Sequence, residues 1–127
     1  MIEEAQKQNK LIAVYGRVST SNQENEGTIE TQLSAVNQFA EKSGFIIVQK
    51  YIDNGWSGDS LARPALDQMR GDAKKKIWDA VLIYDPDRLA RRYSYQELVM
   101  DELKEAGVDV LFVTIPEAKN DEDKISL

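Results

Sequence analysis

The chain has 127 residues, 42% of them hydrophobic and 30% charged, which is the composition of a soluble globular protein with one domain. It has no histidine and no cysteine, so a Ser-His-Asp triad, a Cys-His pair and an H-E-x-x-H zinc site are excluded within it. A metal site would need oxygen ligands alone, which favours magnesium or calcium. The sequence has no apolar run long enough to cross a membrane. The absence of cysteine fits a reducing compartment.

The net charge of −6 argues at first against a nucleic-acid partner, but the charge is unevenly distributed. Residues 61–92 hold eight basic and five acidic side chains, or +3, whereas the segments before and after carry −3 and −6. We expect Lys74 to Lys76 to be solvated helix surface. Arg88, Arg91 and Arg92 instead follow a predicted strand, a position that favours a functional role.

The first half of the chain predicts a strand, a long polar loop and a helix. Residues 1–10 form a polar lead-in that does not resemble a signal peptide. The apolar run 11–15 predicts a buried strand, and the polar residues 16–27 predict a loop of a length often linked to function. Thr28 is the expected N-cap of a helix that ends at Gly44. Its expected buried stripe is Ile29, Leu33, Val36, Phe39 and Ala40.

The second half continues the alternation of strands and helices. Strands are predicted over 45–52, 79–84 and 108–113, the second of these central because nearly every residue is apolar. Pro64 is expected to open a helix with Leu66, Met69 and Ala73 inside. A further helix is predicted over 95–106, and residues 114–127 are acidic and weakly patterned. In the helix predicted over 95–106, the residues expected to lie in helical register are Leu98, Val99, Glu102 and Leu103.

This order predicts an α/β fold with three layers: a largely parallel sheet of four or five strands with helices on both faces. Right-handed crossovers place the loops after the first three strands along one edge of the sheet. Ligands bind at such edges in open α/β sheets. These loops hold Arg17 and Ser19, then Asp53 and Arg63, then Asp87, Arg88 and Arg91.

A serine hydroxyl without a histidine partner is a weak nucleophile, so Ser19 would need help from its surroundings. Attack on a phosphodiester places negative charge on the phosphoryl oxygens, and guanidinium groups match that geometry while staying ionised. Arg88 and Arg91 are three residues apart, so we expect them to share one face of a helical turn. Asp87 beside them could orient an arginine or exchange a proton with a leaving oxygen. Asp85 is expected to cap the end of the strand.

Three sequence blocks resemble the catalytic domain of the serine recombinases, the resolvase/invertase superfamily. The first, Tyr15-Gly-Arg-Val-Ser-Thr-Ser-Asn-Gln23, is similar to the family's Y-x-R-V-S-T-x-x-Q signature. The second is Asp53-x-x-x-Ser57-Gly58 with Arg63-Pro64, and the third is Asp87-Arg-Leu-Ala-Arg91. The blocks stand in the family's order and span residues 11 to about 113. The long stretch before the first helix is most like the large serine integrase and transposon recombinase branch.

The resemblance implies a site-specific DNA recombinase in which Ser19 attacks the scissile phosphodiester. The attack forms a 5′-phosphoseryl DNA intermediate and releases a 3′-hydroxyl; strand exchange and religation follow, with no cofactor and no metal. It also implies a homodimer and a synaptic homotetramer of the full-length protein, with no membrane association. The protein would act in the cytoplasm, encoded by a bacterium, a phage or a mobile element. The implied site comprises Ser19, the phosphate-binding Arg17, Arg63, Arg88 and Arg91, the acid Asp87, and the supporting Tyr15, Gln23, Gln32 and Asp53, with Asp53 tethering an arginine.

The chain departs from the family pattern in three places. Pro86 replaces an apolar residue before Asp-Arg-Leu, and Arg92 adds a charge. We expect residues 11–127 to be the catalytic domain, with the family's dimerisation helix and DNA-binding region absent from this chain. We therefore expect little or no independent DNA cleavage, a mobile loop from Ser19 to Gly27, and Ser19 displaced from the arginines.

Two other functional classes are compatible with parts of the sequence. A flavodoxin-like or receiver-like binding domain would share the fold class, and Asp85 and Asp87 could hold magnesium. That alternative leaves Ser19 and the arginines without a role, and the first strand lacks a phosphate-binding glycine loop. A non-catalytic relative that serves as an assembly module is disfavoured, because the serine and all four arginines are present.

Overall fold

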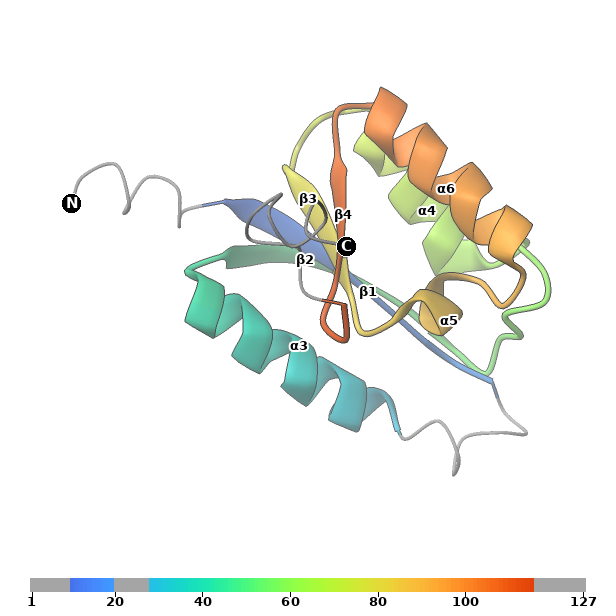
Figure 1. The fold of residues 1–127 in the computed structure, drawn as a ribbon, viewed down its shortest axis with the longest axis horizontal. Helices are drawn as coiled ribbons and strands as arrows, with labels where there is room; N and C mark the ends of the chain where they lie inside the picture. The colour runs from blue at the N-terminus through green and yellow to red at the C-terminus, as the bar shows by residue number, and fades with distance from the viewer. Residues whose placement is uncertain (1–9, 20–27, 116–127) are drawn as a thin grey trace, which may run out of the picture.

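The computed structural model describes residues 10–19 and 28–115, which form a three-layer α/β fold (Figure 1). Four strands make one sheet in the order β2-β1-β3-β4, and every neighbouring pair is parallel. The parallel sheet predicted from the alternation of elements is therefore confirmed. The strands are β1 Leu11–Val18, β2 Ile46–Asn54, β3 Ala80–Ile83 and β4 Asp109–Phe112.

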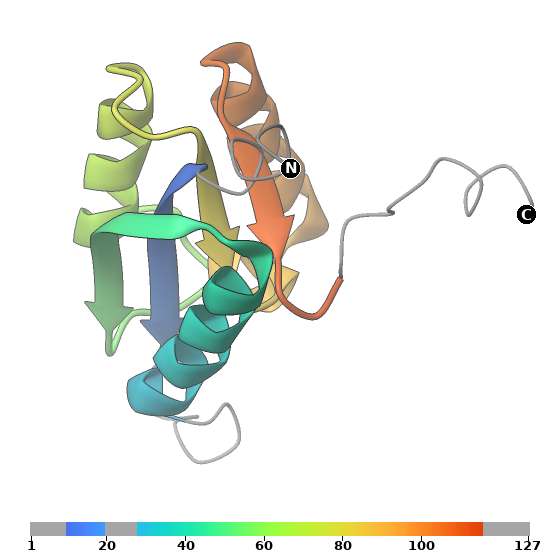
Figure 2. The ribbon, with the colours of Figure 1, turned by 90° about the vertical axis from the view of Figure 1, so that its left-hand side faces the viewer.

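Because the strands are parallel, their carboxyl ends meet at one edge of the sheet, where the arrowheads point in Figure 2. β1 is longer than predicted. Gly16, Arg17 and Val18 pair with Ile52–Asn54 of β2 instead of entering the polar loop. Their burial explains the difference, because β1 is an inner strand of the sheet and Arg17 lies beneath other elements.

Helix α3, Ile29–Ser43, covers one face of the sheet, and α4, Pro64–Ala73, and α6, Tyr93–Glu105, cover the other (Figure 1). Each face has its own apolar cluster. The α3 side buries Ile12, Val14, Val36, Ala40, Ala80 and Leu82. The α4 and α6 side buries Tyr15, Leu66, Met69, Val81, Ile83, Leu89, Val99 and Leu103, among others.

The helix boundaries that the sequence predicted are largely confirmed. The Thr28 side chain caps α3 by accepting from the Thr31 N–H, and Gly44 ends it in the left-handed conformation. Pro64 opens α4, where its fixed φ suits the first helical position. One residue of the predicted stripe of α6 was wrong: Leu98 is 53% exposed, because Val99 and Leu103 face the core.

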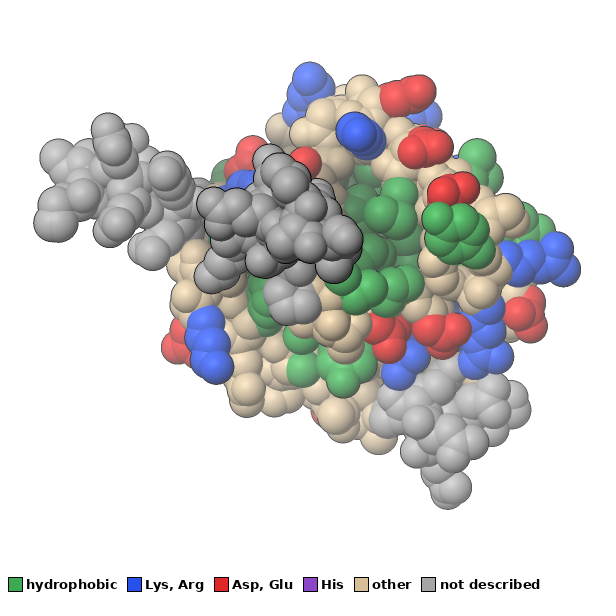
Figure 3. All heavy atoms as spheres, in the orientation of Figure 1, with side chains coloured by type: hydrophobic (Ala, Val, Ile, Leu, Met, Phe, Trp, Pro, Cys, Tyr) green, Lys and Arg blue, Asp and Glu red, His purple; other side chains and the backbone are tan. Residues whose placement is uncertain are grey.

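The face shown in Figure 3 carries a group of hydrophobic side chains beside α6 and β4. Tyr93, Met100, Phe112 and Ile115 contribute to an open groove of about 380 Å³ there. Among the residues described, no helix is both long and apolar enough to span a bilayer.

Candidate active site

A single helical turn, α5 Pro86–Leu89, follows β3 at the carboxyl edge of the sheet. The Asp85 side chain caps it by accepting from the N–H of Arg88 at 3.1 Å, as the sequence predicted for a strand-end cap. Proline at the first helical position needs no hydrogen-bond acceptor for its nitrogen, which suits this start. The turn carries Asp87 and Arg88 and is followed by Arg91.

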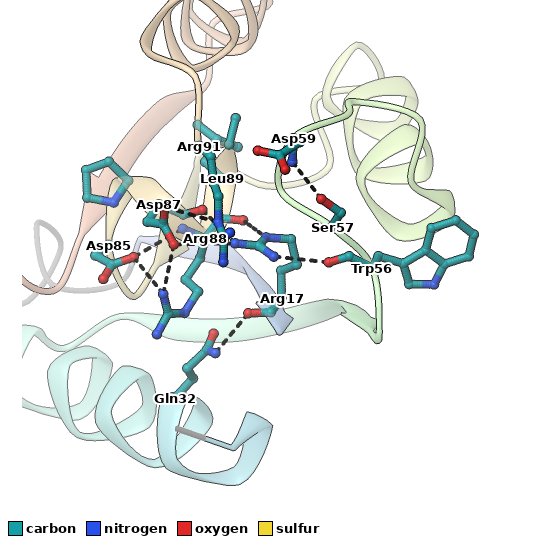
Figure 4. A network of polar contacts seen from close by, with 12 residues as sticks. Arg17, Gln32, Trp56, Ser57, Asp59, Asp85, Asp87, Arg88, Leu89 and Arg91 are labelled. Atoms are coloured by element: carbon teal, nitrogen blue, oxygen red, sulfur yellow. Dashed lines mark hydrogen bonds and ion pairs between the residues drawn. The ribbon is translucent and has the colours of Figure 1, made fainter. Parts of the chain in front are cut away.

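Arg17 reaches this turn from β1 and is completely buried. Its three guanidinium nitrogens donate to main-chain oxygens: Nε to Arg88 at 3.1 Å, Nη1 to Trp56 at 3.0 Å and Nη2 to Asp87 at 2.9 Å (Figure 4). A buried charge is tolerated only when its donors are satisfied, and these carbonyl dipoles satisfy them. Arg17 therefore joins β1, the loop after β2 and α5.

Arg63 is the residue before α4 and is also almost fully buried. Its side chain donates to the Ser60 carbonyl and the Tyr15 hydroxyl, each at 2.9 Å, and to the carbonyl of Arg88 at 3.4 Å. A further, short hydrogen bond reaches the carbonyl of Leu89. Arg63 thus holds the C-terminal end of α5, whereas Asp85 caps its start.

Asp53, at the end of β2, is connected to Arg63 through the Tyr15 hydroxyl, and among the described residues it makes no direct bond to an arginine side chain. Its carboxylate accepts from the Tyr15 hydroxyl at 2.7 Å and from the N–H groups of Ala65 and Leu66 at 2.9 and 3.0 Å. These two amides belong to the first turn of α4, where a negative charge is favoured. Tyr15 links Asp53 to Arg63, and burial raises the pKa of this tyrosine well above its usual range.

The carboxylate of Asp87 lies among three guanidinium groups. It is 3.3 Å from Arg88 Nη1, 3.5 Å from Arg17 Nη2 and 3.6 Å from Arg91 Nε. The Asp87 side chain is 45% exposed, so this group of charges opens toward solvent. Arg88 also pairs with Asp85 at 3.6 Å and lies over the ring of Tyr84.

Arg88 and Arg91 do not share a helical face, so that prediction was wrong. α5 ends at Leu89, and Ala90 has an extended backbone with φ −166° and ψ 150°. Arg91 nevertheless returns to Asp87, because its own N–H donates to the carbonyl of Gly58 at 2.9 Å.

Ser19 follows β1 directly and is 7% exposed, so its place at the sheet edge is as predicted. The preceding carbonyl, of Val18, accepts from the N–H groups of Gly55 and Trp56, which fixes the strand end against the loop after β2. Gln32 of α3 donates from Nε2 to the carbonyl of Arg17 at 2.9 Å (Figure 4). Gln23 and the rest of the loop 20–27 lie outside the described residues.

One residue at the site was not anticipated from the sequence. Gln96 of α6 donates from Nε2 to the carbonyls of Ala90 at 2.8 Å and Pro86 at 3.3 Å. A glutamine near the start of an amphipathic helix gives no local signal of such a contact. Its position in the helix that follows the Arg88 turn is the one feature that could have suggested it.

The arrangement concentrates positive charge at the carboxyl edge of the sheet. Four guanidinium groups, from Arg17, Arg63, Arg88 and Arg91, gather around one turn and outnumber the carboxylates of Asp53, Asp85 and Asp87. Arginine stays ionised and presents paired donors, so such a cluster suits a phosphate or another oxyanion.

Comparisons with known proteins identify the family of this chain. The family model described as "Resolvase, N terminal domain" matches residues 12–127. A protein of Bacillus subtilis (strain 168), named as a candidate DNA recombinase, is 40% identical over 116 residues, which are 91% of this chain and 23% of that protein. The chain thus spans less than a quarter of that relative's length.

Solved structures give the same assignment. The N-terminal catalytic domain of TP901-1 integrase is 31% identical with a TM-score of 0.76, over 83% of this chain and 78% of that one. A resolvase-family site-specific recombinase from Streptococcus pneumoniae is 30% identical with a TM-score of 0.74, over 93% and 82%. The catalytic domain of ISC1926 TnpA, an IS607-like serine recombinase, is 26% identical with a TM-score of 0.72, over 90% and 74%.

The chain belongs to the resolvase N-terminal domain family, and its fold is that of the serine recombinase catalytic domains. The family is one of enzymes, as the resemblance implied. The flavodoxin-like or receiver-like alternative has no support: Asp85 caps α5, and Asp87 pairs with arginines instead of lining an open metal site.

Proposed function

We propose that this chain is the catalytic domain of a site-specific DNA recombinase in which Ser19 attacks a phosphodiester. The observation that carries the proposal is the gathering of four arginines around the α5 turn, one of them Arg17 of β1, which stands two residues before Ser19. The Ser19 oxygen loses its proton and forms a bond to phosphorus while the bond to the 3′ oxygen breaks, and the leaving oxygen gains one proton, so the step balances. This leaves a 5′-phosphoseryl link and a 3′-hydroxyl, and the reverse reaction reseals the exchanged strands.

The four arginines are proposed to act in two ways. Arg88 and Arg91 lie beside the partly exposed carboxylate of Asp87, and they are proposed to contact the phosphate directly. Arg17 and Arg63 donate inward to carbonyls, so they hold the turn and add positive charge beneath it. Removing one well-placed donor to a developing oxyanion costs about 3 kcal/mol of transition-state stabilisation, although groups that share one charge do not add independently.

Asp87 is proposed to give a proton to the leaving 3′ oxygen. Its carboxylate lies among the arginines that would hold the phosphate, which places it near that oxygen, and it must take up a proton before it can give one. Tyr15, Asp53 and Gln32 are proposed as supporting residues, because each binds Arg17 or Arg63 or connects to one of them. Gln23 keeps its proposed supporting role from the sequence resemblance alone.

The parent protein is proposed to work as a homodimer that pairs into a synaptic homotetramer on duplex DNA. Residues 11–127 would be its catalytic domain, with dimerisation and DNA binding supplied by other segments. The net charge of −6 is consistent with this division, because phosphate contacts by basic side chains dominate DNA affinity. Its place of work would be the bacterial cytoplasm.

The test uses the full-length parent and a plasmid carrying its recombination site. Denaturing gels of stalled reactions should show a covalent protein–DNA adduct with the wild type and none with Ser19→Ala. Ser34→Ala, an exposed serine on α3, is the matched control and should retain the adduct. An undiminished adduct with Ser19→Ala would refute the nucleophile assignment.

A further inference from the structure

The α5 turn is too short to be stable alone, because one hydrogen-bonded turn fixes several residues for a single bond. Its backbone bond from the Ala90 N–H to the Pro86 carbonyl measures 3.1 Å. The residues that would contact phosphate are carried by this turn or follow it directly. Their position therefore depends on whatever else holds the turn.

The carbonyls of five consecutive residues, 86 to 90, each accept from a side chain of another element. Arg17 takes those of Asp87 and Arg88, and Arg63 takes those of Arg88 and Leu89. Gln96 takes the two outermost, of Pro86 and Ala90. Arg17, Arg63 and Gln96 thus hold the turn from β1, from the start of α4 and from α6.

Gln96 differs from the two arginines because it is neutral and bonds to both ends of the turn at once. One amide nitrogen that joins the Pro86 and Ala90 carbonyls fixes the length of the segment carrying Asp87 and Arg88. It also fixes Ala90, the residue that precedes Arg91. Being uncharged, the amide does not compete with the guanidinium groups for an anion.

We propose that Gln96 is a positioning residue that aims Arg88 and Arg91 at the phosphate by fixing both ends of α5. This inference rests on the proposed function, since it assumes that these arginines bind phosphate. It assigns Gln96 a role in ligand affinity in addition to stability. A displacement of about 1 Å at a site can cost two orders of magnitude in rate, so a single amide can matter this much.

The test uses the 127-residue chain and inorganic phosphate as the probe. Nuclear magnetic resonance follows the side-chain Nε–H signals of Arg88 and Arg91 during a phosphate titration, and amide hydrogen exchange follows Ala90. Gln96→Ala and Gln96→Glu should weaken phosphate binding at least fivefold and speed the Ala90 exchange. The glutamate keeps the shape of the side chain but replaces the donor by an acceptor. Gln68→Ala, an exposed glutamine on α4, is the matched control and should change neither.

The outcomes separate this inference from the proposed function. If the wild type shows no phosphate response at Arg88 and Arg91, both the phosphate site and the role of Gln96 are overturned. If the wild type responds and both Gln96 variants bind phosphate equally well, only the positioning role is overturned. Wild-type affinity in Gln96→Glu alone would also overturn it, because the shape of the side chain would then suffice.

Discussion

Gly58 allows the side chains of Arg17 and Arg91 to pack closely against the loop after β2, and replacing it by alanine tests that packing. A Cβ at this position would lie 2.8 Å from Cζ and Nη2 of Arg17 and 2.9 Å from Cγ of Arg91. Real Cβ atoms do not approach heavy atoms so closely, so a neighbour must move. Arg17 cannot move cheaply, because its guanidinium group is buried and bonded to three carbonyls.

Overpacking of this kind costs about 1–3 kcal/mol. Gly58→Ala should therefore lower the free energy of unfolding by that amount in urea denaturation. For a domain of this size the corresponding drop in Tm is about 4 °C per kcal/mol. Gly71→Ala is the matched control, since a Cβ there would have no neighbour within 4 Å and the residue lies inside α4. It should raise stability by about 0.5–1 kcal/mol, the usual gain of alanine over glycine in a helix.

A Gly58→Ala protein as stable as the wild type would show that Arg17 and Arg91 do not constrain this loop. The same conclusion would follow if both alanine variants shifted the urea midpoint equally, because the effect would then come from the unfolded chain. An unchanged slope of the transition is the internal check that both variants unfold to a similar state.

Three further predictions concern the supports of the site and the packing around it. Asp53→Ala should cost about 2–3 kcal/mol in urea denaturation, because two buried donors and one partly buried donor lose their charged acceptor; a loss below about 0.5 kcal/mol would contradict this. In the wild type, the raised pKa of Tyr15 contributes stability that is complete below the unfolded-state pKa near 10 and is lost as the pH rises further. The free energy of unfolding of Tyr15→Phe should therefore fall less steeply at alkaline pH than that of the wild type. Parallel falls in the two proteins would count against this. Glu102→Gln breaks a partly exposed ion pair with Arg70 and should cost under about 1 kcal/mol, an effect that about 1 M salt removes; a larger, salt-independent loss would show that the pair behaves as buried.

Arg17 and Arg63 are buried, and their side chains bind main-chain carbonyls of α5. The sequence does not distinguish this structural role from direct phosphate binding. Both residues stand in the sequence blocks that resemble the recombinases, and both were predicted to be phosphate ligands. In the structure their N–H groups are directed to the main chain of α5 and its neighbours. Direct contact between either residue and a phosphate would require those bonds to be exchanged for bonds to the anion.

The predictions of the fold depended on residues whose effect is limited to their near neighbours in the chain. Thr28, Gly44 and Pro64 act within one helical turn of where they stand in the chain, so their roles follow from residue type alone. The alternation of apolar runs and amphipathic stretches predicted the parallel sheet because crossovers between parallel strands require intervening segments. Leu98 was misassigned because a helix face can be shifted by one residue while still looking amphipathic.

The residue types alone predict the chemistry that is available at this sheet edge: a serine, four arginines and an aspartate near the ends of strands, with no histidine or cysteine. Which partner each guanidinium group binds follows only from the tertiary structure. The contact from Arg17 to the Arg88 carbonyl joins residues 71 positions apart, and the one from Gln96 to Pro86 depends on how α6 packs against α5. Such bonds form where packing brings a side-chain donor to a buried carbonyl that needs a hydrogen-bond partner. A local sequence pattern does not show which carbonyls will be buried in this way.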